Sequence, residues 1–408
     1  MIKKILGYIH IESFGLLEML FAFFMILTGY KYGSLRFDLL TLLLMDVLAL
    51  KRGKGIRLYR PLFYIAVYVI LHELFLLLFV KDIPPTHINF VLGLAIHLFS
   101  IFIIAPALEY EKLKSALFLV SAISMAGIIY HFLIIQTGGS VTPIKLPFFP
   151  EMAETSRLYE EGLRPKGFYW EPAAFITFIL VPLFIALRER YTIWAIMIVF
   201  TMFLSSSTTG IALSTTMVGI YILTQKVSIK FKLLTAVVMV AMLAILFMGN
   251  LFEPGMTKIR ETEVETTARL INGPELVEHM PKEHLVFGFP DSHVWDYYMK
   301  NPEIKRANLI LSEDHDYIFV ATFWHVLAKD GIVGLVLLLY LYLIIMIRER
   351  ELLPYLGALF IALFTSGIFF SSAFTYEFSF ILAVIYHIYQ SEEDEFENQG
   401  IGYQYGSV

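Results

Sequence analysis

The chain has 408 residues, of which 58% are hydrophobic and only 16% charged, and its mean hydropathy is +0.70. Soluble globular chains average about 45–50% apolar and about 25% charged residues. The composition therefore excludes a water-soluble enzyme, a disordered protein and a basic nucleic-acid-binding protein, and it predicts an all-α polytopic membrane protein. The chain has no cysteine, which excludes disulfides, thiolate metal sites and cysteine nucleophiles.

Apolar segments of suitable length predict about twelve transmembrane helices, since a membrane core of roughly 30 Å needs about 20 apolar residues per helix. The second segment contains Asp38 and Asp46, and its charged ends are expected to snorkel toward water. In chain order the predicted helices cover residues 14–30, 37–50, 60–80, 89–108, 115–135, 173–187, 191–204, 209–224, 233–250, 332–347, 354–372 and 376–390.

Basic residues predict the orientation, because loops on the cytoplasmic side of a membrane carry an excess of Lys and Arg. With both termini cytoplasmic, the short outer loops carry only Lys31, Arg36 and Lys81. We expect the first helix to be an uncleaved anchor, since no small-residue cleavage site follows it. The inner segments carry sixteen basic residues: Lys3, Lys4, Lys51, Arg52, Lys54, Arg57, Arg60, Lys112, Lys114, Arg188, Arg190, Lys226, Lys230, Lys232, Arg348 and Arg350.

Two long segments between predicted helices both lie on the outer side of this topology. Long loops on one face of a scaffold are where binding and catalytic residues concentrate. A surface helix is expected from Asp316 to Leu327, stopping near Gly331. The expected organisation is helices 1–5 in residues 1–135, a first large loop in 136–172, helices 6–9 in 173–250, a second large loop in 251–331, helices 10–12 in 332–390 and a cytoplasmic tail in 391–408.

The first long loop ends in a charged and aromatic segment that runs from Arg164 to Glu171, directly before Pro172. Proline suits the first helical position, where its missing N–H costs nothing, so Glu171 is placed at a helix start. One interpretation is an aromatic belt with a helix cap at the membrane surface. The other is an anion site lined by Arg164 and Lys166, with aromatic rings on which a sugar face stacks. Spacing alone leaves both open.

The second long loop carries eight basic and fourteen acidic residues between positions 251 and 331, so it has no diffuse positive field. An anionic ligand there depends on individual arginines, since guanidinium groups suit phosphate oxygens. The hydroxyl-rich run from Ser205 to Gly210 is interpreted first as a tight turn and second as a glycan-binding segment on the same face.

Metal-binding motifs are weak, and no metal or other cofactor is predicted. His72-Glu73 begins like HExxH, but residue 76 is leucine, so the zinc motif fails. Asp314-His315-Asp316 matches Asp-x-Asp in an external acidic loop, whereas the nucleotide sugars bound by that pattern are cytoplasmic. The isolated intramembrane residues His97 and His131 are expected to be neutral and hydrogen-bonded to neighbouring helices.

The segment LRPKGFYWEPAAF at 163–175 resembles the Arg…Gly…Glu-Pro element of Wzy-type O-antigen and exopolysaccharide polymerases. FLSSSTTGIAL at 203–213 resembles the Ser/Gly hairpin of that family. ETTARLINGPELVEHM at 265–280 resembles the Arg-containing start of the family's second periplasmic loop, with Arg269 in the arginine position.

Two further elements extend the resemblance toward the C-terminus. His315 followed by KDGIVGL resembles the His…Gly-Ile-x-Gly element shared with O-antigen ligases, although the spacing to Gly331 is about one helical turn longer than usual. His325 is therefore a competing candidate. LFTSGIFFSSAFTYEFSFILAV at 363–384 resembles the closing helices of colanic-acid-type polymerases, with Glu377 at the family's external carboxylate.

The resemblance implies a GT-C-like, metal-independent, inverting glycosyltransferase of the bacterial inner membrane. Such polymerases join oligosaccharide repeat units carried on undecaprenyl diphosphate at the periplasmic face. The implied partners are a lipid-linked glycan donor and acceptor, membrane lipids, a chain-length regulator and a flippase, with no nucleic acid.

The chemistry needs a base for the acceptor hydroxyl and cations for the diphosphate leaving group. His315 and Glu171 are the base candidates. Arg164 and Arg269, supported by Lys166, are assigned to the diphosphate, and the remaining candidates are assigned to substrate binding: Arg260, Tyr169, Trp170, Trp295 and Glu377.

Two alternatives from other classes stay open. An O-antigen ligase would use the same chemistry with a lipid A-core acceptor. A flippase or other transporter would predict repeated helix bundles and short loops, and here the loops are long and no repeat is evident.

Overall fold

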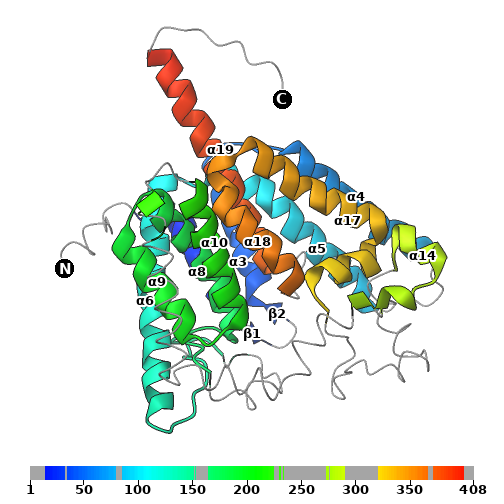
Figure 1. Cartoon of the computed structure of the whole chain (residues 1–408). Coiled ribbons are helices and arrows are strands. Elements are labelled where there is room, and N and C mark those ends of the chain that lie inside the picture. Colours follow the sequence, from blue (N-terminus) through cyan, green and yellow to red (C-terminus); the bar gives the residue numbers. More distant parts are fainter. Residues whose placement is uncertain are drawn as a thin grey trace.

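The computed structural model describes residues 14–32, 35–79, 85–150, 152, 164–224, 229–230, 233, 273–274, 276–289, 320–365 and 371–398. Within these ranges the chain is predominantly helical (Figure 1), which confirms the predicted all-α class. The strands among the described residues are the two-residue pair β1 (Lys31–Tyr32) and β2 (Leu35–Arg36), which are antiparallel and lead directly into α3.

The helices follow the predicted apolar segments closely. Eleven of the twelve predicted segments have a helical counterpart, and the remaining one, 233–250, lies almost entirely outside the described residues. The helices are α2 (Leu16–Leu27), α3 (Phe37–Lys51), α4 (Arg60–Phe79), α5 (Pro85–Ile104), η2 (Ala105–Ala107), α6 (Tyr110–Gln136), α8 (Pro172–Arg188), α9 (Thr192–Leu204), α10 (Thr208–Thr224), α14 (Lys282–Phe287), α17 (Thr322–Arg348), η3 (Arg350–Leu352), α18 (Leu353–Thr365) and α19 (Ser372–Asn398).

Three of the described helical segments are long and apolar enough to cross a membrane. They cover Ile88–Ala107, Tyr110–Gln136 and Thr322–Arg348. The second half of α17 also exposes an apolar stripe with helical spacing, formed by Ile332, Val336, Tyr340, Leu343 and Ile347. A continuous apolar stripe of this kind is costly in water and suits contact with lipid.

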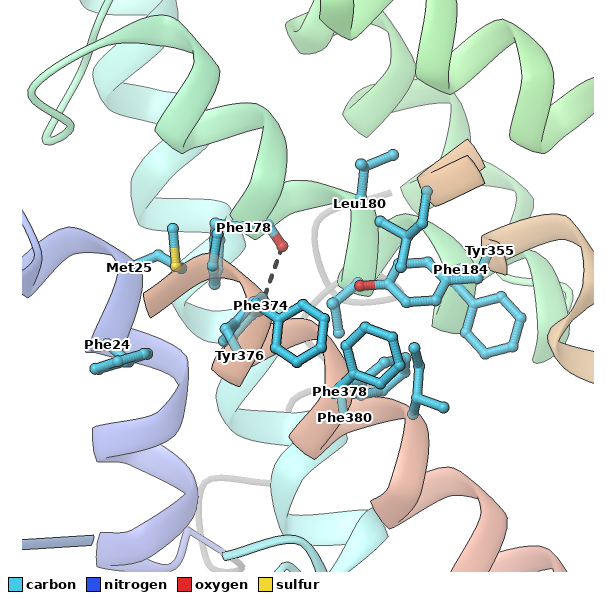
Figure 2. Packing of buried hydrophobic residues seen from close by; sticks show 14 of the residues in the cluster. Phe24, Met25, Phe178, Leu180, Phe184, Tyr355, Phe374, Tyr376, Phe378 and Phe380 are labelled. Carbon is cyan, nitrogen blue, oxygen red and sulfur yellow. Dashed lines mark hydrogen bonds between the residues drawn. The ribbon is translucent and has the colours of Figure 1, made fainter. Parts of the chain in front are cut away.

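The bundle is held together by aromatic packing around α19, α8 and α2 (Figure 2). The ring of Tyr376 stacks on Phe21 with centroids 4.8 Å apart, and its hydroxyl donates to the carbonyl oxygen of Phe178 at 3.3 Å. Between membrane helices, close packing and polar contacts of this kind carry the association, because lipid tails are as apolar as the side chains.

Helix α17 is two helices joined at a sharp bend. Gly331 has φ +67° and interrupts the helical backbone, so the first part ends where the sequence predicted the surface helix to stop. Gly288, at the end of α14, also has a positive φ, and the two glycines let the two backbones meet. A Cβ atom on Gly331 would lie 2.1 Å from the carbonyl oxygen of Val286, and one on Gly288 would lie 2.0 Å from that of Lys329. Only glycine fits at both positions.

Candidate functional site

The segment from Arg164 to Glu171 lies against the C-terminal half of α6. Gly167 has φ +57°, and a Cβ atom there would sit 3.3 Å from the backbone nitrogen of Ile128. On the helix side, a Cβ atom at Gly127 would sit 3.0 Å from the ring of Phe168. Paired glycines thus bring the loop backbone onto the helix, which explains the glycine at position 167.

His131 on α6 binds the backbone of the same segment. Its Nδ1 atom accepts hydrogen bonds from the backbone N–H groups of Lys166 at 3.3 Å and Gly167 at 3.1 Å. Because Nδ1 accepts, the ring is neutral and carries its proton on Nε2. The expected hydrogen bond to a neighbouring helix is not what these contacts show, because the groups that His131 accepts from belong to the loop segment before α8.

Arg164 connects this segment to the turn between α9 and α10. Its Nη2 atom donates to the carbonyl oxygen of Ser206 at 3.4 Å. Ser206 has φ +52°, and its neighbours Ser205 and Ser207 are also buried. Ser207 accepts a bond from the backbone N–H of Gly210 at 3.2 Å, so the serines build a tight turn, as the first of the two interpretations predicted.

The aromatic residues of the segment differ in exposure. Tyr169 is fully buried between Phe175 and Phe178, and its hydroxyl is hydrogen-bonded to Ser124 at 2.8 Å. Burial raises the pKa of the Tyr169 hydroxyl, which therefore stays protonated. Trp170 is only half-buried and packs over Gly29, so it is the ring of this pair that a ligand reaches more readily.

The charged residues of the segment also differ in exposure. Arg164 and Glu171 are half-buried, whereas Lys166 is only 1% exposed. Pro172 occupies the first turn of α8 as predicted, and the Glu171 carboxylate makes no capping bond to that helix. The side-chain cap of the first interpretation is therefore not formed, although Glu171 does stand at the helix start.

Glu377 is half-buried on α19, within electrostatic reach of Tyr342 on α17 and Tyr355 on α18. His325 lies in the first turn of α17 and is half-buried. The other predicted site residues, Arg260, Arg269, Trp295 and His315, lie outside the described residues.

A polar network that the sequence did not predict joins α3, α5 and α19. Asp38 is buried, accepts from Ser372 at 2.6 Å and pairs with Arg36 at 2.5 Å. His97 faces it at 3.9 Å and is hydrogen-bonded to Thr375 at 3.0 Å. This bond confirms that His97 is tied to a neighbouring helix.

A second buried cluster lies where α4 meets the bend of α17. His72, Glu73 and Asp330 have donor atoms within 4.8 Å of one another, and the ammonium group of Lys329 lies 3.4 Å from Glu73. Among the described residues, these are the side chains with the composition to hold a metal ion. The adjacent His72-Glu73 pair was visible in the sequence, but its approach to Asp330 depends on tertiary folding.

Comparisons with protein-family models, with curated proteins and with solved structures found no match.

Proposed function

We propose that the chain is a Wzy-type polymerase, which joins undecaprenyl-diphosphate-linked repeat units into O-antigen, capsule or exopolysaccharide at the periplasmic face of the inner membrane. The observation that supports this most directly is the hydrogen bond from Arg164 to Ser206. It connects segments 163–175 and 203–213, which resemble two separate elements of that family. Two such elements in contact are harder to explain by chance than either alone.

The proposed architecture has about twelve transmembrane helices in a GT-C-like arrangement, with both termini cytoplasmic and loops 136–172 and 251–331 periplasmic. The helix directions support the common face of the two elements. The C-terminal end of α6, the N-terminal end of α8 and the turn between α9 and α10 lie at the same end of the bundle (Figure 1).

In the proposed reaction, the acceptor hydroxyl transfers its proton to a base, either Glu171 or His315. Its oxygen attacks the anomeric carbon of the donor on the face opposite the diphosphate. The bond between that carbon and the diphosphate oxygen breaks, and undecaprenyl diphosphate leaves with the electron pair. Arg164 and Arg269 stabilise the developing negative charge, and buried Lys166 adds to the local positive potential.

The test is to delete the gene and complement it with the wild type, Arg164→Ala, Arg164→Lys or a control, Arg350→Ala, at matched protein levels. Arg350 is an exposed arginine on the cytoplasmic side of the expected topology. Arg164→Ala should lower polymer roughly 100-fold and accumulate single lipid-linked repeats. Arg164→Lys should retain part of the activity, and Arg350→Ala should match the wild type.

Gel electrophoresis and mass spectrometry of the lipid-linked glycans separate the alternatives. Loss of a ligase would leave long polymer on undecaprenyl diphosphate. Loss of a flippase would trap repeat units where periplasmic probes do not reach them. Undiminished polymer in Arg164→Ala cells with normal protein levels contradicts the assignment of Arg164.

A further inference from the structure

Four ionisable side chains are buried together where α4 meets the bend of α17. Glu73 and Asp330 are 0% exposed, Lys329 is 3% exposed and His72 is 7% exposed. Burying such groups is costly unless they are paired or bind an ion, so a cluster of this kind points to a specific role. None of these residues belongs to the site proposed for glycosyl transfer.

The orientation of the His72 ring is fixed by a hydrogen bond from its Nε2 atom. Nε2 lies at hydrogen-bond distance from the carbonyl oxygen of Phe287, and because a carbonyl only accepts, Nε2 must carry the proton. Metal-binding histidines typically donate their second ring N–H to a carbonyl or carboxylate in this way, which orients the other nitrogen.

The other ring nitrogen of His72, Nδ1, faces the carboxylate of Asp330. Nδ1 lies 3.8 Å from Oδ1 of Asp330 and makes no hydrogen bond to the described part of the chain. This separation is too long for a hydrogen bond. It suits two ligands of one ion, since donors at about 2.0–2.2 Å from a metal stand roughly 3–4 Å apart.

We propose that His72, Glu73 and Asp330 bind a divalent transition-metal ion with the preferences of Zn²⁺. One imidazole nitrogen and two carboxylates form a donor set that such ions favour, and a water molecule completes the coordination. The donor atoms lie within 4.8 Å of one another, so the widest-spaced donors move closer by about 1 Å on binding.

Lys329 brings a positive charge close to this site. Its ammonium group is 3.4 Å from Oε1 of Glu73 and 4.3 Å from the ring centroid of Phe90. The ion and the two carboxylates neutralise one another, and the ammonium group retains the ring face of Phe90 as its partner. The ion ties α4 to the bend at Gly331, and complete burial of both carboxylates suits a structural role.

The experiment uses the full-length protein purified in detergent, stripped with a chelator, incubated with Zn²⁺ alone and desalted. The wild type should retain about one more equivalent of zinc than His72→Ala or Asp330→Asn. His97→Gln is the matched control, because His97 is a buried histidine that also faces an aspartate, and it should bind zinc like the wild type. Co²⁺ loading should give ligand-field absorption bands in the wild type and control only.

Wild-type stability provides a readout that does not depend on the variants folding. Zn²⁺ should raise its unfolding temperature and the chelator should reverse this, whereas Mg²⁺ should have no effect. Equal zinc content in the wild type and both variants, or an unfolding temperature that Zn²⁺ does not change, overturns the proposal.

Discussion

The guanidinium group of Arg52 donates two hydrogen bonds to the carboxylate of Glu18, at 2.5 and 2.8 Å. It also donates to the carbonyl oxygen of Ala107 at 2.7 Å, so one side chain connects α2, the end of α3 and η2. The bonds to Glu18 raise the pKa of Arg52, which stays charged at any accessible pH. The fully buried acidic residue Glu18 thus has a structural partner.

We expect Arg52→Ala to lower the free energy of unfolding by about 2–4 kcal/mol, because it leaves the fully buried Glu18 carboxylate without its cation. Thermal unfolding in detergent measures the change. The double variant Arg52→Ala, Glu18→Gln should recover part of the loss. A single variant as stable as the wild type would show that the pair contributes nothing.

Substituting Asp38 tests the network between α3 and α19. Asp38→Ala removes the acceptor for Ser372 and the partner of Arg36, and we expect it to cost about 2–3 kcal/mol. Asp38→Asn keeps an acceptor for the Ser372 hydroxyl and should cost less. Equal losses for both variants, measured by thermal unfolding, would assign the effect to charge alone.

The glycine pair beneath the Arg164–Glu171 segment predicts a loss of activity without a loss of fold. In Gly127→Val, the new side chain displaces Phe168, because even a Cβ atom would be 3.0 Å from its ring. We expect polymer to decrease at least about tenfold, with misplacement of Arg164 as the cause. The control is Gly219→Val, another helical glycine with open space around it. Equal polymer levels in both variants would show that the position of the Arg164–Glu171 segment does not affect the activity.

Gly331→Ala tests the bend of α17. The substitution combines a positive φ with a Cβ atom 2.1 Å from a backbone oxygen, so we expect a loss of about 2–4 kcal/mol in unfolding free energy. Gly93→Ala on α5, where the added atom meets open space, should be neutral or slightly stabilising. Comparable unfolding temperatures for the two variants would contradict the role of Gly331.

The two base candidates predict different effects of substitution on polymer formation in isolated membranes. If Glu171 is the base, Glu171→Gln abolishes activity at every pH, because the amide does not accept the proton. His315→Gln should then retain activity, and the reverse result assigns the base to His315. Retained activity in both single variants would exclude both residues as the base.

The sequence predicted the helices well because their signals are local. Long apolar segments, the proline at position 172 and the glycine at position 331 mark helices and their ends within a few residues. The tight Ser205–Ser207 turn could be predicted for the same reason.

Contacts between distant parts of the chain could not be predicted in this way. Ser372 bonds to Asp38 across 334 positions, and Asp330 meets His72 only because α17 bends beside α4. The burial of Tyr169 and Lys166 also escaped prediction, because it depends on how the loop folds onto α6. Such contacts follow from packing, for which a single sequence has no periodic signal.

The bond from the backbone N–H of Phe289 to the carbonyl oxygen of Ala328 has a consequence for how the chain tolerates change. It anchors the chain just before residue 290, while Val320 leads directly into the same helix, α17. The ends of the intervening segment are therefore held by the bundle whatever its length. Since lengthening a closed loop costs little entropy, insertions there should leave the helices undisturbed.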